Sequence, residues 1–286
     1  MSLQLVCDPR LNVTGNLVES MREALPDPVV VGEARDFRSG LEAALDSGSR
    51  SLAVAGDDAS FDEAVATIMT RPDHGQVRLT IIPLRDSDFA RTFGLPQEPL
   101  RACEHASSDS VYEMDVVKVT ASAGERFLVR VAGVGFSARM TSQELSLPAF
   151  LGRGRRFLGF WVGLARSRPR VIRVSVGSRQ RFEGEAWDVV VGNCQFFGGL
   201  RVSPRSFPGD GSIEILVRTG SRSQAFRKMP LMFSGEHVPS DEIFEFRAKT
   251  ASVESDRKVP FHIDGVPWGT TPVSFEVVPQ AFLLSV

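Results

Sequence analysis

Residues that could bind a phosphate group or a metal ion gather in a few short loops of this sequence. The first loop, residues 55–59, contains Gly56, Asp57 and Asp58 and lies between an apolar run and a helical pattern. Free backbone N–H groups and the helix dipole converge at such a position and favour an anion. A phosphate-binding loop ordinarily has several glycines, so that its N–H groups can approach the oxygens closely. Here Gly56 is the one glycine, and the two aspartates add negative charge.

Two further loops offer polar groups of the same kind. Residues 83–91 contain no glycine and present Ser87 and Asp88. Residues 192–199 are rich in glycine and are followed by Asp210 in an Asp-Gly pair. The glycines indicate tight turns or a close approach of the backbone. Because Mg²⁺ favours carboxylate ligands, the aspartates of the first two loops could bridge this ion to phosphate groups.

The elements that position the first two loops alternate between strands and helices. Apolar runs at residues 51–55 and 77–83 are each followed by a helix-like pattern of apolar residues. Ser60 followed by Glu63 predicts a capping box with Ser60 as the cap of the first of these helices. The repeated order of strand, loop and helix favours a parallel sheet, in which ligands bind outside the carboxyl ends of the strands.

The pattern changes from about residue 112 to short strands divided by Gly, Pro and Ser turns, which favours an antiparallel sheet or sandwich. Residues 127–132, for example, alternate as one strand. The predicted fold class is therefore α/β followed by β. We place an α/β domain of nucleotide-binding type over residues 1–118 and a β-sandwich domain over residues 119–286.

Together these segments resemble the diacylglycerol kinase and sphingosine kinase catalytic-domain family, especially its bacterial lipid kinases. The resemblance extends in order over nearly the whole chain. The segments that carry it in the second half are Gly133–Ala138, Val191-Gly192-Asn193, Gly198-Gly199, Ser203-Pro204, Asp210-Gly211, Ile263-Asp264-Gly265 and Val277–Ala281.

The resemblance implies a NAD kinase-like first domain, a cleft between the domains, and final residues that pack back on the first domain. It implies that ATP and Mg²⁺ serve as cofactors and that the γ-phosphoryl group is transferred to the hydroxyl of a diacylglycerol-like lipid. It assigns Asp264 as the catalytic base and Asp210 as a metal ligand. The residues that it assigns to the nucleotide are Asp8, Gly56, Asp57, Asp58, Ser87 and Asp88.

The sequence departs from the family pattern where that chemistry would occur. The first loop reads Ala-Gly-Asp-Asp-Ala in place of Gly-Gly-Asp-Gly-Thr, the second lacks both family glycines, and Val266 replaces a Glu. One hypothesis is a working lipid kinase, with a changed choice of nucleotide as a variant of it. The rival is an inactive family member that binds a lipid or a protein partner, in which the Asp58 carboxylate itself occupies the phosphate position.

Simpler structural roles compete with the functional ones for three aspartates. Asp210 and Asp264 each precede a glycine, and Asp-Gly is a common turn pair. Asp57 lies at the start of a helix, where the dipole favours a carboxylate. The sequence leaves both interpretations open for each residue.

Composition limits the location and partners of the protein. A net charge of -2 argues against a nucleic-acid partner, and 3 scattered Cys without metal-ligand spacing are typical of a cytoplasmic protein. Residues 153–181 contain many Arg and no Asp or Glu. Such a segment could lie on an anionic membrane surface, so we expect a cytoplasmic protein that associates peripherally with the inner face of the membrane. The oligomeric state is left open.

Overall fold

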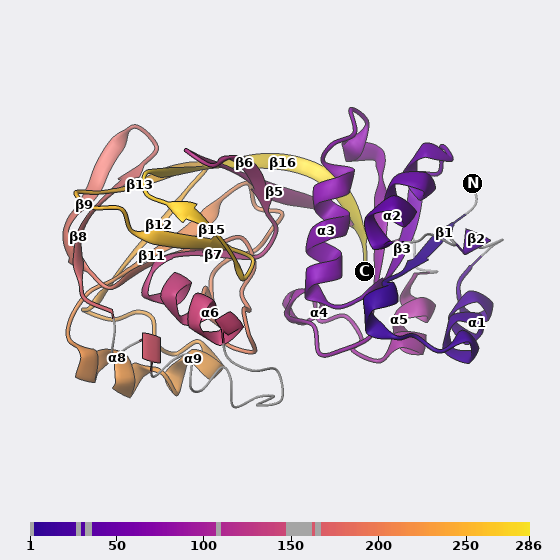
Figure 1. Cartoon of the computed structure of the whole chain (residues 1–286), viewed down its shortest axis with the longest axis horizontal. Coiled ribbons are helices and arrows are strands. Elements are labelled where there is room, and N and C mark those ends of the chain that lie inside the picture. The colour runs from indigo at the N-terminus through magenta and orange to yellow at the C-terminus, as the bar shows by residue number, and fades with distance from the viewer. Residues whose placement is uncertain (1–2, 27–29, 32–35, 107–109, 147–161, 164–166) are drawn as a thin grey trace. The chain divides into compact units, whose positions relative to one another are not determined.

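The computed structural model describes residues 3–26, 30–31, 36–106, 110–146, 162–163 and 167–286 (Figure 1). The chain divides into two compact units. Unit 1 comprises Met1–Val116 together with Pro279–Val286, and unit 2 comprises Val117–Val278. In the described part of the chain, no helix is both long enough and apolar enough to cross a membrane.

Unit 1 contains a parallel sheet with the strand order β2-β1-β3-β4, to which the last residues of β16 add a further parallel strand. The burial of β3 and β4 is almost continuous, as expected for strands that are covered on both faces. Helices α1 and α5 pack against each other, and so do α2 and α3. The elements are β1 (Gln4–Cys7), η1 (Pro9–Leu11), α1 (Gly15–Ala24), β2 (Val30–Val31), α2 (Phe37–Asp46), β3 (Ser51–Gly56), α3 (Asp58–Ile68), η2 (His74–Gln76), β4 (Arg78–Pro83), α4 (Asp88–Phe93) and α5 (Pro99–His105).

Unit 2 is built from two sheets that enclose one large apolar core. One sheet has six strands in the order β12-β11-β10-β7-β14-β15, and its neighbours are antiparallel. The other contains β13, β8 and β9, with the first residues of β16, the last residues of β5, and β6. The elements are β5 (Val111–Ala121), β6 (Gly124–Leu128), β7 (Val131–Gly135), α6 (Phe136–Ser146), β8 (Arg170–Val176), β9 (Arg179–Ala186), β10 (Asp188–Gly192), β11 (Ile213–Arg218), α8 (Arg222–Lys228), α9 (Leu231–Ser234), β12 (Ile243–Ala248), β13 (Thr250–Ser255), β14 (Pro260–Ile263), β15 (Val266–Thr270) and β16 (Val273–Ser285).

The predicted fold class, α/β followed by a β-sandwich, is confirmed. One predicted strand is interrupted, however. The alternation over residues 127–132 is divided between β6, which ends at Leu128, and β7, which begins at Val131. The chain leaves the strand at residues 129–130 because the backbone N–H groups there bind a side chain from a distant turn, which is described below.

Candidate functional site

Two strand-to-helix loops lie at the carboxyl edge of the unit 1 sheet. β3 ends at Gly56 and β4 ends at Pro83, and these two residues are paired on neighbouring parallel strands. α3 begins at Asp58 and α4 begins at Asp88, directly after the two loops. The fold therefore brings the two expected nucleotide loops to one edge of the sheet.

The first loop is closed by hydrogen bonds to its own helix. Asp57 is the N-cap of α3, and its Oδ1 accepts the N–H groups of Ala59 and Ser60 at 3.1 and 3.2 Å. The Ser60 hydroxyl accepts the Asp57 N–H at 3.1 Å, which completes a capping box. The expected cap at Ser60 is thus wrong by three residues. A Cβ at Gly56 would lie 2.3 Å from the Ser60 Cβ, so the glycine makes room for this contact.

Asp8 is tied into the same network. Its side chain is almost fully buried, and its Oδ2 accepts the Ser60 hydroxyl at 2.6 Å. The Arg10 guanidinium donates to both Asp8 oxygens at 2.7–3.0 Å and also reaches Glu63 at 2.9 Å. Burial raises the pKa of the Asp8 carboxyl, but the hydrogen bonds from Arg10 and Ser60 outweigh it and leave this pKa below its ordinary value.

The Asp58 carboxylate lies at the start of α4 and accepts three hydrogen bonds from that segment. Its Oδ1 accepts the Ser87 hydroxyl at 2.6 Å and the Phe89 N–H at 3.3 Å. Its Oδ2 accepts the Asp88 N–H at 3.1 Å. Unpaired N–H groups at a helix start ordinarily need an anion, a cap or water. In this chain a carboxylate from the neighbouring loop supplies the negative charge.

The rest of the second loop is also held internally. The Ser87 hydroxyl caps α4 by accepting the Ala90 N–H at 3.0 Å. The Gln97 side chain accepts the Ser87 N–H at 2.8 Å and donates to the Ser87 carbonyl at 3.0 Å. Asp88 is buried, and its Oδ1 accepts from Arg91 at 3.0 Å.

Six of the eight residues predicted for the site therefore lie together in unit 1, but the polar side chains among them are hydrogen-bonded to groups of unit 1 itself. The fit to the triphosphate of ATP is poor, because the N–H donors of Asp88 and Phe89 at the start of α4 already have a carboxylate acceptor. Among the described residues, no group of three or more His, Cys, Asp or Glu side chains could hold a metal ion.

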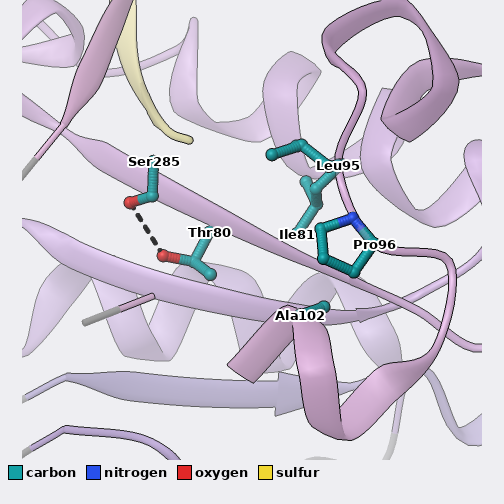
Figure 2. Close-up of a pocket in the computed structure, with 6 residues that line it drawn as sticks. All are labelled: Thr80, Ile81, Leu95, Pro96, Ala102 and Ser285. Atoms are coloured by element: carbon teal, nitrogen blue, oxygen red, sulfur yellow. Dashed lines mark hydrogen bonds between the residues drawn. The ribbon is translucent and has the colours of Figure 1, made fainter. Parts of the chain in front are cut away.

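A hollow elsewhere in unit 1 offers no alternative nucleotide site. Its lining comes from β4, α5, the segment after α4 and the last residues of β16 (Figure 2). The Thr80 and Ser285 hydroxyls at its rim are hydrogen-bonded to each other at 3.0 Å (Figure 2). Its volume of about 10 Å³ corresponds to a single water molecule.

Asp264, the expected base, lies in a tight turn of unit 2 between β14 and β15. Its backbone φ of 49° and that of Gly265, 83°, fit a two-residue hairpin turn. The buried carboxylate accepts the N–H groups of Val129, Arg130 and Val131 at 2.8, 2.8 and 2.9 Å. Burial raises the pKa of Asp264, while the Arg130 guanidinium and these N–H donors act in the opposite direction.

The opposite side of the same segment is held by the Gly-Asn loop after β10. The Asn193 side chain donates to the Val129 carbonyl at 2.8 Å, and the backbone N–H groups of Asn193 and Cys194 donate to the Arg130 carbonyl at 2.9 and 3.0 Å. The Asp-Gly turn and the Gly-Asn loop thus fix one short segment from two sides. This is why residues 129–130 do not continue the strand.

Gly192 and the Ser-Pro motif form a second buried network. A Cβ at Gly192 would lie 2.1 Å from the Ser203 Oγ. The buried Glu214 carboxylate accepts the hydroxyls of Ser203 and Ser206 at 2.6 and 3.2 Å and the Arg205 N–H at 3.1 Å. The glycine in this motif is required because the two serine hydroxyls converge beside it.

A protein-family comparison decides the family. Residues 130–286, more than half of the chain, match the model of the YegS C-terminal NAD kinase beta sandwich-like domain. The chain belongs to the YegS-like lipid kinase family. The matched region contains both buried networks of unit 2 except for Val129.

Individual relatives agree with this family, and solved structures agree with the fold. A diacylglycerol kinase of Mycobacterium tuberculosis is 28% identical over 258 residues, which cover 88% of this chain and 82% of the relative. A protein of Shewanella frigidimarina named as a probable YegS-like lipid kinase is 28% identical over 84% of this chain and 77% of its own length. A solved diacylglycerol kinase structure from Bacillus anthracis covers 99% of this chain and 96% of its own, with a TM-score of 0.73 at 18% identity. A second structure from that organism has a TM-score of 0.80.

Asp210, the metal ligand expected from the family resemblance, lies in an exposed turn of this YegS-like chain. Its Oδ1 accepts the Ser212 N–H at 3.0 Å and the Ser212 hydroxyl at 2.6 Å, and its Oδ2 pairs with Arg247. The role of Asp210 as a metal ligand stays a prediction. So does the role of Asp264 as a base, although three backbone groups bind its carboxylate.

The Arg-rich segment expected at a membrane lies partly outside the described residues of this YegS-like chain. Residues 147–161 and 164–166 are not among them, whereas Arg168 and Arg170 are.

Sequence reasoning also missed residues that organise the candidate site: Arg10, Gln97, Arg130, Asn193 and Glu214. Asn193 belonged to a quoted motif, but the other four carried no signal that distinguishes them from surface residues of the same types.

Proposed function

We propose that this YegS-like protein binds a diacylglycerol-like lipid and does not transfer phosphate from ATP to it. The single observation that carries the proposal is the contact of the Asp58 carboxylate with Ser87, Asp88 and Phe89 at the start of α4. The family reaction is phosphorylation of a lipid hydroxyl, and the named relatives include diacylglycerol kinases.

The Asp58 contact opposes nucleotide use in two ways. It consumes backbone N–H donors that a phosphate group would need, and it puts a negative charge where phosphate oxygens would lie. Phosphoryl transfer depends almost entirely on positioning and on neutralisation of charge. Loss of one such donor typically costs about 10²–10³ in rate, so loss of two would cost on the order of 10⁴ or more if the effects multiply.

The lipid part of the proposal is supported by unit 2. Its Gly-Asn, Asp-Gly and Ser-Pro motifs are present and form hydrogen-bonded networks. Beside them, Phe197 stacks on His262 with ring centroids 5.2 Å apart, and Arg130 lies 5.6 Å from the Phe197 ring centroid. The sequence motifs of the family's β half are therefore retained in a packed arrangement, unlike the glycine-rich loops of its α/β half.

The test compares the natural protein with a variant that restores the family glycines, Ala55→Gly with Asp58→Gly. Calorimetric titration with Mg·ATP should give no saturable binding for the natural protein up to millimolar ATP and measurable binding for the variant. Asp36→Gly is the matched control, because Asp36 caps another helix of unit 1. Circular dichroism establishes that each variant is folded, so that a lack of binding is not a lack of structure.

The lipid arm uses dioctanoylglycerol in neutral detergent micelles. Binding of this lipid should be detectable by tryptophan fluorescence and should not depend on Mg·ATP. Absence of lipid binding in a folded sample would overturn this half of the proposal and leave a protein partner as the alternative.

A working kinase is the second candidate, and the 28% identity to a diacylglycerol kinase over 88% of the chain favours it. In that case Gly56, Asp57, Ser87 and Asp88 would surround ATP, and Asp264 would act as the base. Saturable Mg·ATP binding together with transfer of labelled γ-phosphate to dioctanoylglycerol would establish this candidate and overturn our proposal.

A further inference from the structure

A small basic hollow lies in unit 2, next to the start of α6 and the start of β8. Arg139, Arg168 and Arg170 line it together with Phe136 and Trp187, and no acidic side chain is among its lining residues. Its volume of about 10 Å³ admits only part of a small group, so a ligand would rest on its rim. Arg168 is exposed, and Arg139 and Arg170 are half-buried, so their guanidinium groups can be reached from solvent.

The three arginines differ from Arg173 and Arg218 of unit 2 in their charge partners. Arg173 pairs with Asp256 at 3.0 Å, and Arg218 lies 3.7 Å from Asp188. Within the described part of the chain, Arg139, Arg168 and Arg170 form no ion pair. Three like charges around one hollow repel one another, and an anion bound between them would remove this repulsion.

The chemistry of the lining favours a phosphate group at a membrane. The planar guanidinium donates two parallel hydrogen bonds that match phosphate oxygens. The Trp187 indole N–H donates to the Gly220 carbonyl at 2.7 Å, which fixes an amphipathic ring at the hollow. Tryptophan side chains of this kind are favoured where water meets a lipid headgroup layer.

We propose that this hollow binds the phosphate group of an anionic phospholipid and so attaches unit 2 to a membrane surface. The inference rests on the proposed lipid-binding function, because attachment to a membrane would bring unit 2 to the surface that contains a diacylglycerol-like ligand. It needs no residue outside the described part of the chain. It is a different site from the aspartate-rich edge of unit 1.

The experiment measures sedimentation of the full chain with vesicles made of equal parts phosphatidylglycerol and phosphatidylcholine, and with pure phosphatidylcholine vesicles. The test variant is Arg168→Ala with Arg170→Ala. The control, Arg179→Ala with Arg181→Ala, removes the same charge from exposed positions on β9. Since each basic residue near an anionic membrane contributes about 1 kcal/mol, the test variant should bind phosphatidylglycerol vesicles about thirtyfold less, which corresponds to about 2 kcal/mol.

Each outcome decides the inference. Binding to phosphatidylglycerol vesicles that is lost in the test variant and kept in the control supports it. An equal loss in both variants would show only an effect of net charge and would overturn it, as would no binding by the natural protein. Calorimetric binding of inorganic phosphate that is lost in the test variant, together with no vesicle binding, would assign the hollow to a free anion and overturn the membrane inference. Dioctanoylglycerol binding in neutral micelles is measured in parallel, so that the proposed function is tested separately from the membrane inference.

Discussion

Removal of the Asp58 carboxylate should weaken the edge of the unit 1 sheet measurably. Asp58→Ala deletes three hydrogen bonds to the start of α4, from Ser87, Asp88 and Phe89. A hydrogen bond to a charged group contributes about 1.5–3 kcal/mol, and water can replace part of each at a half-buried position. We therefore expect the free energy of unfolding to fall by about 3 kcal/mol.

Tryptophan fluorescence would not report on unit 1, because Trp161, Trp187 and Trp268 all belong to unit 2. The assay must therefore use another signal. Urea unfolding followed by circular dichroism gives the change in free energy, and hydrogen exchange of a peptide that spans residues 86–93 gives its location. In Asp58→Ala the amides of Asp88 and Phe89 should exchange faster.

Asp36→Ala is the control for this measurement. Asp36 accepts the Ser39 N–H and hydroxyl at 2.9 and 2.8 Å within its own helix turn. Its removal should leave exchange at residues 86–93 unchanged. The reasoning is refuted if Asp58→Ala alters the free energy of unfolding by less than about 0.5 kcal/mol, the range of an ordinary surface substitution, with unchanged exchange at α4.

Three further predictions address single residues. Asp264→Asn places an NH₂ group against one of the backbone N–H donors. The free energy of unfolding in urea titrations should therefore fall by about 3 kcal/mol or more. A purely catalytic Asp264 would leave this free energy unchanged. Burial lowers the pKa of His262 to about 3, below its value in the unfolded chain. The free energy of unfolding should therefore fall as the pH drops from about 6.5 toward 3, by up to ~1.4 kcal/mol per pH unit. In urea titrations at several pH values, His262→Asn should reduce this slope. Gly56→Ala should be strongly destabilising, and Ser60→Gly in the same chain should restore part of the loss in thermal unfolding, since the added Cβ would collide with the Ser60 side chain.

The fold could be predicted from the sequence because its signals are local. The apolar runs that form β3 and β4 and the helical patterns after them depend on neighbouring residues only. The start of α3 was misplaced because Asp57 and Ser60 both suit a cap, and the choice depends on Asp8, which lies 52 positions from Ser60 and binds its hydroxyl. A residue so distant in sequence leaves no periodic signal.

The sequence predicted which residues lie at the candidate site but not what their polar groups bind. The sequence indicated that Asp58 and Ser87 belong to neighbouring loops, but whether they face a ligand or each other depends on a contact across 29 positions. The same limit applies to Asp264, whose carboxylate interrupts a predicted strand 133–135 positions earlier in the chain. The Asp264-Gly265 pair indicates a turn and does not reveal what the carboxylate binds.

The two halves of the family pattern differ in which hydrogen-bonding groups their motif residues bind. In unit 2, the Asp264 and Asn193 side chains hydrogen-bond buried backbone groups, so the motif stabilises the fold whether or not a ligand is bound. In unit 1, a glycine-rich loop would leave N–H groups for phosphate or water to satisfy, and without a ligand such groups contribute little to stability. The Asp58 carboxylate satisfies N–H groups of α4 permanently, and the short contact to Ser87 joins the two altered loops. The substitutions therefore act as a pair: together they exchange a ligand-dependent contact for an internal one, which stabilises unit 1 in the absence of nucleotide.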